Sequence, residues 1–330
     1  MTEFGTEVSV SQALLDACQH ALENNLMVGS GEKVLVVTDL PKKKIGLAFE
    51  LAARRLTRDV ALAEIPVAAR NGQEPPSTVA EEMTRADVIL MPVTKSLSWT
   101  EARLAATETG ARVASMPGIT EQIILRTFYA DYQAIQKRVR GLCDLLDRSR
   151  SLRVTTSLGT DIKMDISGRL GRGRRGGLYT EAGAWGNLPC GEAFIAPIEG
   201  SADGVYVVDA SHSGVGRLSD PICFVVSEGS VKEIEGGREA YKLAALLEEV
   251  NSRDAYKIAE LGIGCNDRAS ICGITLEDEK ALGTCHIAVG SNVLFGGTTA
   301  VDIHLDGVLT RPTIHVDQQK VIEDGRLLTG

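Results

Sequence analysis

Four short apolar runs between residues 33 and 117, separated by segments of helical periodicity, constrain the fold most strongly. They read VLVVTD, VALAEI, VILMPV and RVASMP and begin at residues 34, 60, 88 and 112. Uninterrupted aliphatic runs of this kind are typical of parallel strands that are buried on both faces. Strands that alternate with helices predict an open, mostly parallel sheet with helices packed on both sides.

The segments around these runs carry apolar residues three and four positions apart, which predicts helices. We expect helices over 9–28, 41–56, 77–85 and 98–109, and one long helix over 119–150 that bridges to the second half. Such folds bind ligands at the carboxyl ends of their strands, here residues 38–39, 92–94 and 115–116. No glycine-rich GxGxxG loop follows the first strand, so this half is expected to be a scaffold rather than a nucleotide-binding domain.

From residue 152 the pattern changes to short alternating runs, which indicates β-structure. The glycine-dense, basic stretch LGRGRRGGLYTEAGAWG predicts a mobile loop, either over a cleft or on the free surface. Helices are expected over 237–250 and 253–260, with Glu260 ending the second, and a closing hairpin over 312–328. The predicted fold class is α/β, with an N-terminal open, mostly parallel sheet and flanking helices, plus a β-rich α+β C-terminal domain. The predicted domains are 1–150, a scaffold with its bridging helix, and 151–330, a metal-binding catalytic domain.

Composition and charge exclude several partners. The 330 residues carry a formal net charge of -9, whereas nucleic-acid binders usually carry a basic patch. No apolar run approaches the roughly 18–20 residues that span a bilayer, and the N-terminus lacks the basic region of a signal peptide. We therefore expect a cytoplasmic protein with neither a nucleic-acid nor a membrane partner. The seven cysteines form no CxxC pair and are expected to be free thiols; Cys190, Cys265 and Cys285 adjoin candidate site residues.

Histidines and carboxylates gather in the last third of the chain. His304 and Asp306 are separated by one residue, so in a strand their side chains point to the same face. His286 and the carboxylates Glu260, Asp278 and Glu279 precede them in an apolar, glycine-rich setting, and Glu192 is the upstream candidate. Imidazole and carboxylate groups in a sheltered cleft suit a divalent metal ion. His20, His212 and His315 are expected to lie outside this site, on a helix, in a loop and on a surface strand.

With these residues assembled, the chain resembles the aminopeptidase T and aminopeptidase S family of metallopeptidases. The resemblance rests on four motifs in the family's order, NLPCGEAFIAPIEGSADG, AELGIGCN, DEKALGTCHIAVG and IHLDGV. It is best over residues 150–330, and the N-terminal half agrees in its α/β character. The 2,5-dihydroxypyridine dioxygenases share the same fold.

The resemblance implies two divalent ions, Zn, Co or Mn, bound in a cleft of a dimeric enzyme that removes N-terminal residues from small peptides. It implies the metal ligands Glu192, Glu260, His286, His304 and Asp306. Glu260 and Glu279 are the candidates for proton transfer. Members of this family usually carry a tyrosine seven residues after the GTxH histidine, where this chain has valine at position 293.

Two other functions are compatible with the same residues. His286, His304 and Asp306 alone form a two-histidine, one-carboxylate set, the arrangement of non-haem Fe(II) oxygenases. This alternative is a mononuclear ring-cleaving dioxygenase of the 2,5-dihydroxypyridine type. The third possibility is a non-catalytic metal-binding protein of the same fold. The metallo-aminopeptidase is the leading prediction, because Glu192 and Glu260 favour a dinuclear site.

Overall fold

The computed structural model describes residues 9–328, and the chain divides into two compact units. Residues 177–189 belong with the N-terminal unit, which otherwise ends at Ala130, and residues 131–176 and 190 onward form the second unit. The predicted boundary at residue 150 differs from this division in two ways. The segment expected to form one bridging helix over 119–150 is divided between the units after Ala130. A later segment returns to the first unit because it adds a strand to the first sheet.

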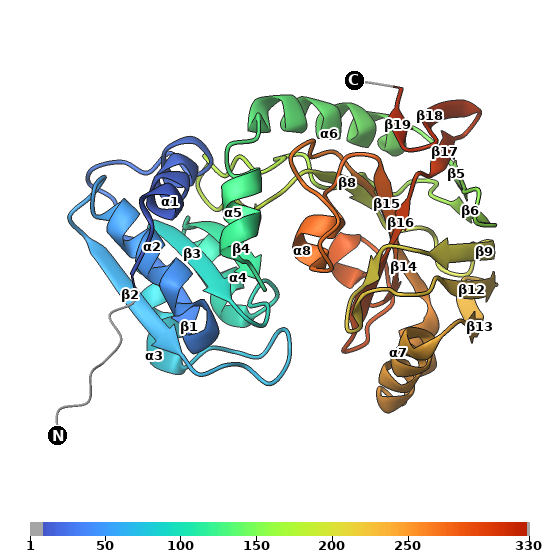
Figure 1. Ribbon diagram of the computed structural model, residues 1–330, viewed down its shortest axis with the longest axis horizontal. Helices are drawn as coiled ribbons and strands as arrows, with labels where there is room; N and C mark the ends of the chain where they lie inside the picture. Colours follow the sequence, from blue (N-terminus) through green and yellow to red (C-terminus); the bar gives the residue numbers. More distant parts are fainter. Residues whose placement is uncertain (1–8, 329–330) are drawn as a thin grey trace. The chain divides into compact units, whose positions relative to one another are not determined.

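The N-terminal unit contains a five-stranded sheet in the order β2-β1-β3-β4-β7 (Figure 1). All four strand pairs are parallel, and every residue of β1 and β3 is buried, as expected of central strands in a sheet covered on both faces. This confirms the predicted α/β class. The strands are β1 (Val34–Asp39), β2 (Val60–Ile65), β3 (Val88–Val93), β4 (Arg112–Pro117) and β7 (Trp185–Asn187).

Short helices connect these strands and cover the sheet. Val79 and Met83 of one helix and Ala102 and Ala106 of another pack in one core with residues of β1, β3 and β4. Several helices begin at a capping side chain; for example, Ser11 Oγ accepts a hydrogen bond from the Leu14 N–H. The helices of this unit are α1 (Gln12–Asn24), η1 (Leu40–Lys42), α2 (Lys43–Ala53), α3 (Ser77–Met83), α4 (Glu101–Glu108) and α5 (Glu121–Thr127).

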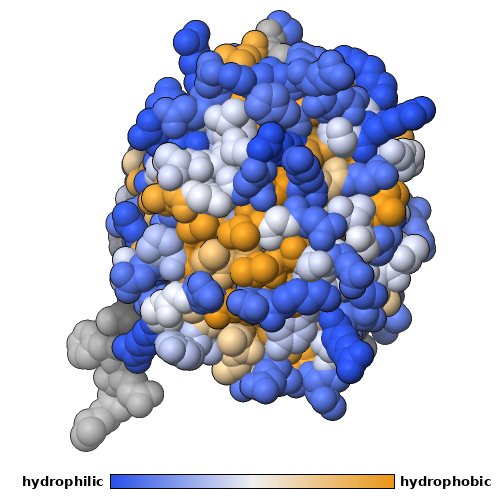
Figure 2. Space-filling model, turned by 90° about the vertical axis from the view of Figure 1, so that its right-hand side faces the viewer, coloured by the Kyte–Doolittle hydropathy of each residue, from blue (hydrophilic) through white to orange (hydrophobic). Residues whose placement is uncertain are grey.

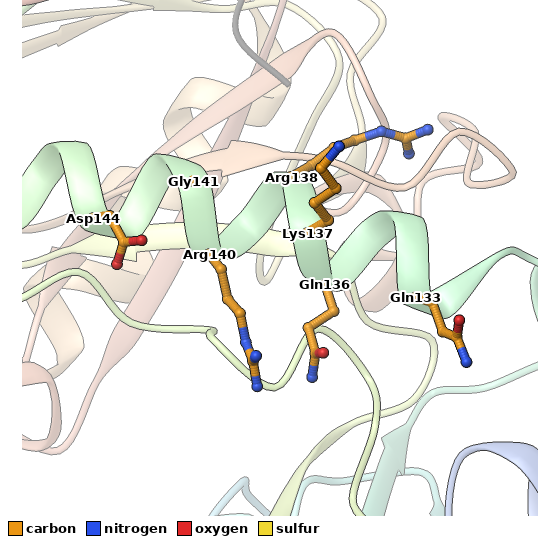
Figure 3. A pocket seen from close by; sticks show the side chains of 7 residues that line it. All are labelled: Gln133, Gln136, Lys137, Arg138, Arg140, Gly141 and Asp144. Carbon is orange, nitrogen blue, oxygen red and sulfur yellow. The ribbon is translucent and has the colours of Figure 1, made fainter.

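The long helix predicted over 119–150 is in fact two helices. α5 ends at Thr127, and α6 (Tyr132–Asp147) begins after Asp131, whose Oδ1 accepts hydrogen bonds from the N–H groups of Gln133 and Ala134. This capping carboxylate interrupts the apolar periodicity that had suggested one helix. The outer face of α6 borders a hollow of about 470 Å³ (Figure 3), lined by Gln133, Gln136, Lys137, Arg138, Arg140, Gly141 and Asp144.

A six-stranded sheet in the second unit, in the order β11-β10-β16-β15-β14-β8, carries the candidate site. Glu260 lies in the middle of its fully buried strand β14, so the helix predicted over 253–260 is wrong beyond a short 3₁₀ turn. A central strand buried on both faces lacks the alternation that identifies strands in a sequence. The strands are β8 (Glu192–Ile195), β10 (Ser211–His212), β11 (Gly216–Arg217), β14 (Ile258–Gly264), β15 (Thr284–Gly290) and β16 (His304–Thr310).

The other sheet of this unit has eight antiparallel strands in the order β13-β12-β9-β6-β5-β17-β18-β19. Val205 pairs with Val225 and Val207 with Cys223; Val207 is buried and the other three are half-buried. Figure 2 shows an apolar area on the side of the molecule where β9 and β12 are labelled in Figure 1. The strands are β5 (Ser151–Thr155), β6 (Asp161–Asp165), β9 (Asp203–Val208), β12 (Ile222–Ser227), β13 (Ser230–Glu235), β17 (Thr313–Val316), β18 (Gln319–Glu323) and β19 (Arg326–Leu327).

The remaining helical elements are short. α7 (Arg238–Glu249) confirms the helix predicted over 237–250, and the others are η2 (Arg253–Tyr256), α8 (Thr275–Asp278) and η3 (Val293–Phe295). None of the helices in residues 9–328 is long and apolar enough to cross a bilayer. All seven cysteines are free thiols, as expected.

The basic loop expected to be mobile is instead held by several contacts. Arg172 N–H donates to the Phe194 carbonyl at 2.7 Å, and Arg174 pairs with Asp144 and Asp147 of α6. His212 also differs from its prediction as a loop residue, because it lies in β10 and is 1% exposed. These contacts could not be predicted from the glycine-rich sequence, because they involve backbone groups and acidic residues that are distant along the chain.

Candidate metal centre

Four neighbouring strands bring all the predicted ligands to one face of the six-stranded sheet. Glu192 opens β8, Glu260 lies in β14, His286 in β15, and His304 and Asp306 in β16. In β14, Gly264 pairs with Glu192 and Gly262 pairs with His286. In β15, Ala288 pairs with Glu260 on one side and with Asp306 on the other. Because side chains alternate along a strand, these pairings place the five ligand candidates on the same side.

One cluster is formed by Glu260, His304 and Asp306. His304 Nε2 lies 3.4 Å from Glu260 Oε2 and 3.3 Å from Asp306 Oδ1. A first-row divalent ion binds N and O atoms at about 2.0–2.2 Å, so adjacent ligand atoms of one ion lie about 3.0–3.4 Å apart. The distances from His304 Nε2 to the two carboxylate oxygens therefore match those between adjacent ligands of one metal ion.

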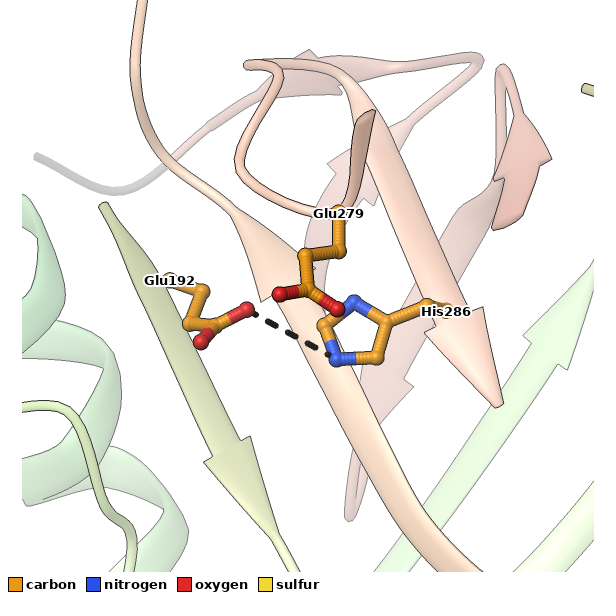
Figure 4. Close-up of side chains that lie close together, drawn as sticks. All are labelled: Glu192, Glu279 and His286. Carbon is orange, nitrogen blue, oxygen red and sulfur yellow. Dashed lines mark ion pairs between the residues drawn. The ribbon is translucent and has the colours of Figure 1, made fainter. Parts of the chain in front are cut away.

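A second cluster consists of Glu192, Glu279 and His286 (Figure 4). His286 Nε2 lies 3.7 Å from Glu192 Oε2 and 3.2 Å from Glu260 Oε1, so this cluster adjoins the first through the Glu260 carboxylate. Within the described residues, Glu192 Oε2 and His286 Nδ1 are buried and have no hydrogen-bond partner. His286, which the dioxygenase alternative grouped with His304 and Asp306, thus belongs to the neighbouring cluster.

Lys280 is the site residue that the sequence analysis missed. Its side chain is completely buried, and Nζ lies 2.8 Å from Glu192 Oε1 and also pairs with Glu279. The ammonium therefore balances negative charge at one end of the second cluster. The sequence signal for Lys280 was its position directly after two acidic residues in the DEK motif. A buried lysine almost always needs an acidic partner, and such partners are adjacent here.

Gly262 is required by the close approach of His286. A Cβ at position 262 would lie 2.0 Å from His286 Cε1 and 2.1 Å from Nε2. The imidazole therefore lies directly across the β14 backbone, in space that any side chain at position 262 would fill. This explains why a glycine follows Glu260 two residues later in the middle of a buried strand.

Groups around the first cluster orient its ligands. His304 Nδ1 lies 2.8 Å from the Ser291 carbonyl, which leaves Nε2 to face Glu260 and Asp306. Ser213 Oγ lies 3.4 Å from Asp306 Oδ2, and the Phe295 ring meets the His304 ring edge-on at a centroid distance of 5.1 Å. Metal-binding histidines usually have their second nitrogen fixed in this way.

Burial and charge shift the pKa values of both histidines. Burial alone would lower the pKa of His286, but its hydrogen bond with Glu260 and the charges of Glu192, Glu260 and Glu279 outweigh burial and raise the pKa to about 9. Burial is likewise outweighed at His304, where Asp306 and Glu260 raise the pKa well above its usual value. Without metal, both imidazoles are therefore protonated at neutral pH.

The pKa values of two carboxyl groups of the site shift in opposite directions. Burial and the nearby charges of Glu192 and Asp306 raise the pKa of Glu279 to about 8, although Lys280 opposes this. Burial would also raise the pKa of Asp306, but His304 holds it well below its usual range. Glu279 is thus the carboxyl group of the site best able to exchange a proton near neutral pH.

Other candidate residues have different positions. Asp278 accepts hydrogen bonds from the N–H groups of Cys272 and Gly273 at 2.7 and 2.9 Å, so its carboxylate holds a loop instead of joining a cluster. Val293 lies in η3 and is 44% exposed. Cys190, Cys265 and Cys285 are buried and belong to neither ligand cluster, in agreement with the interpretation of most cysteines as small apolar residues.

Sequence comparison decides between the families that share this fold. The sequence profile of the 2,5-dihydroxypyridine 5,6-dioxygenase family matches residues 13–329. The chain belongs to this family. The predicted assignment to the aminopeptidase T and S family is therefore not confirmed, and the aminopeptidase prediction is wrong, together with the hydrolase and protease functions that it implied. The prediction that the protein is an enzyme is supported, because the chain belongs to a family of dioxygenases.

A relative found by sequence agrees with this assignment, and a solved structure has the same fold. The 2,5-dihydroxypyridine 5,6-dioxygenase of Pseudomonas putida KT2440 is 28% identical over 207 residues, which are 58% of this chain and 57% of the relative. The chain thus matches a little over half the length of this relative. A solved structure of the 2,5-dihydroxypyridine dioxygenase of Pseudomonas putida KT2440 superposes with a TM-score of 0.82 at 22% identity, covering 97% of this chain and 98% of the other.

A peptidase-type structure has the same fold. Wild-type AmpT from Thermus thermophilus superposes with a TM-score of 0.72 at 17% identity, over 96% of this chain and 99% of AmpT. At this identity the likeness shows the fold alone. The resemblance to a peptidase family is thus accompanied by a fold that this chain shares with AmpT.

Proposed function

We propose that the protein is a ring-cleaving dioxygenase that acts on a hydroxylated pyridine-type ring and uses a single Fe(II) ion held by Glu260, His304 and Asp306. The observation that carries this proposal is the spacing of their three ligand atoms, 3.3 and 3.4 Å from His304 Nε2, in a chain of the dioxygenase family. The donor set of one imidazole and two carboxylates suits a divalent first-row metal ion. An iron ion bound there would supply the redox chemistry that activates O2.

Lys280 supports one ion instead of two. Glu192 and Glu279, the carboxylates of the second cluster, already share its buried ammonium. A second dication beside Lys280 would place like charges close together in a site with little water, which is unfavourable. His286 then acts through Glu260, because its Nε2–H is within hydrogen-bond distance of Glu260 Oε1.

The surrounding side chains would position the substrate and move its protons. Glu279 would exchange a proton with a ring hydroxyl, because its pKa of about 8 lies close to neutral pH. The ring of Phe295 beside His304 would exclude water from one side of the site. Both atoms of O2 would enter the product as a ring carbon–carbon bond breaks, so no further reductant is needed.

The proposal is tested with protein reconstituted with Fe(II) under nitrogen and then mixed with 2,5-dihydroxypyridine. We expect the ring absorbance to disappear only after oxygen is admitted, with uptake of one O2 per ring. Metal analysis should find about one iron per chain, which follows from assigning the ion to the cluster of Glu260, His304 and Asp306 alone. Hydrolysis of aminoacyl reporter substrates with no oxygen uptake would refute the proposal.

A further inference from the structure

The basic loop at residues 169–176 extends the sheet that carries the metal centre. Arg172 forms an antiparallel bridge with Phe194 of β8, in which each N–H donates to the other carbonyl, at 2.7 and 3.3 Å. Directly opposed residues of an antiparallel pair project their side chains to the same face. Phe194 lies two residues after Glu192, so the side chains of Phe194 and Arg172 are on the face that carries the ligand clusters.

Two aromatic rings connect this arginine to the proposed metal ligands. Phe295 meets His304 edge-on at 5.1 Å, and Phe194 meets Phe295 edge-on at 5.4 Å. The Arg172 side chain reaches the same segment, because its Nη2 lies 3.4 Å from the position that a Cβ on Gly296 would take. The order along this face is therefore His304, Phe295, Phe194 and Arg172.

The segment that carries Phe295 is held firmly. Glu199 Oε1 accepts hydrogen bonds from Asn292 Nδ2 at 3.0 Å and from the Thr298 N–H at 2.6 Å, and its other oxygen pairs with Arg169. Burial would raise the pKa of Glu199, but these hydrogen bonds and the charge of Arg169 lower it to about 2. Glu199 therefore stays ionised, and the position of Phe295 is fixed by contacts on both sides of η3.

Arg172 differs from its neighbours in having no evident structural role for its charge. Arg169 pairs with Glu199 and Arg174 with two aspartates, whereas in the described residues 9–328 the Arg172 guanidinium makes no ion pair or hydrogen bond. The residue is exposed. An arginine beside aromatic rings can bind an anionic oxygen through its planar fork of N–H donors.

We propose that Arg172 recognises an anionic oxygen, such as a carboxylate, on a planar aromatic substrate whose ring packs against Phe194 and Phe295. This inference rests on the proposed function, because it names the substrate class of the same site. The guanidinium would bind the anionic group at one end of the ring, while the hydroxylated end faces His304 and Asp306. Arg172 is thus a specificity-determining residue.

The test compares two ligands that differ only in a carboxylate, 5-hydroxypyridine-3-carboxylate and 3-hydroxypyridine. Their affinities are measured by calorimetry under nitrogen, so that no turnover occurs, with the full chain loaded with iron. We expect wild type to prefer the carboxylated ring, and Arg172→Met to weaken its binding about tenfold or more, the effect of losing a charge-assisted hydrogen bond. Binding of the uncharged ring should change little.

Two further variants make the result specific. Arg172→Lys keeps the charge and should restore part of the preference, whereas Arg175→Met, in the same loop and also exposed, should bind both ligands as wild type does. The proposal is overturned if wild type does not prefer the carboxylated ring, if Arg172→Met keeps the preference, or if it loses affinity for both ligands equally. Failure of the proposed dioxygenase would instead appear as absent oxygen uptake in wild type, which this anaerobic comparison does not measure.

Discussion

Glu260 is the residue at which the two ligand clusters meet. Its Oε1 lies 3.2 Å from His286 Nε2 and its Oε2 lies 3.4 Å from His304 Nε2. The sequence predicted both histidines and this glutamate as ligands, but it could not assign them to clusters, because that depends on strand register. Lys280 was missed for a similar reason, since burial of its ammonium between Glu192 and Glu279 arises only in the folded chain.

Loss of Asp306 should remove the metal. Asp306→Asn takes away a ligand charge and the partner of the half-buried His304, so we expect iron content to fall from about one per chain to near zero. Asp302→Asn is the matched control, because Asp302 is exposed, is two residues from His304 and belongs to neither cluster. Elemental analysis measures the iron content of both purified variants. Iron that is fully retained in Asp306→Asn would contradict the ligand assignment.

Metal binding to the iron-free protein should strengthen as the pH rises. His304 carries a proton at neutral pH because its pKa is raised, and a metal must displace that proton. The apparent affinity for Mn²⁺, measured by calorimetry between pH 6 and 8, should rise by up to about tenfold per pH unit for one displaced proton. An affinity that is independent of pH would show that the imidazole is neutral in the free protein.

The same protonation should stabilise the iron-free protein in acid. A folded pKa of about 9 for His286, against about 6.5 for an unperturbed histidine, gives stability that is fully present below pH 6.5 and lost as the pH rises through 9. The melting temperature without metal should therefore fall between pH 6.5 and 9. Replacement of His286 by Gln should flatten this dependence, and an unchanged slope would exclude His286 as its source.

At the scale of single elements, β14 shows what the sequence concealed. The segment IAELGIG is buried at every residue and pairs with β8 on one side and β15 on the other, so it has no polar face to reveal its period. The parallel strands of the first unit were predictable because apolar runs alternate with helices there. The break between α5 and α6 depended instead on the single capping residue Asp131.

Gly262 should tolerate no side chain. Gly262→Ala places a methyl group 2.0 Å from the His286 ring, so the imidazole must move or β14 must separate from β15. We expect strongly reduced oxygen uptake and a loss of stability of about 1–3 kcal/mol, typical of overpacking. Chemical denaturation and an oxygen electrode measure the two effects.

Gly141→Ala is the matched control for that substitution. Gly141 lies in the middle of α6, and nothing is within 4 Å of the position that its Cβ would take. This change should stabilise the protein by up to about 1 kcal/mol, because alanine is the better helix former. Equal effects of the two substitutions would show that the close approach at Gly262 is not the cause.

At the scale of the whole molecule, the α/β class was predictable but the way the chain divides was not. The strand Trp185–Asn187 joins the N-terminal sheet although it follows α6 and two strands of the second unit. The return of the chain to the first sheet depends on the pairing of β7 with β4, and no local sequence pattern predicts that pairing. The expected homodimer stays a prediction, as does the cytoplasmic location.

Membership of the family favours one kind of chemistry, which the ligand types alone did not. Histidines and carboxylates of this order suit both a dinuclear hydrolase and a mononuclear oxygenase, so the motifs alone favoured the wrong enzyme. The match over residues 13–329 overturns the hydrolase prediction and favours the oxygenase alternative. The buried Lys280 gives a physical reason to expect a single metal ion.

The source of the oxygen atoms in the product tests the central claim most directly. Iron-loaded protein is given 2,5-dihydroxypyridine under ¹⁸O2 in ordinary water, and the product is analysed by mass spectrometry. A dioxygenase predicts a ring-opened product that contains both labelled atoms. A product labelled only when the water carries the isotope, or a ring that remains intact in the presence of oxygen, would contradict the account.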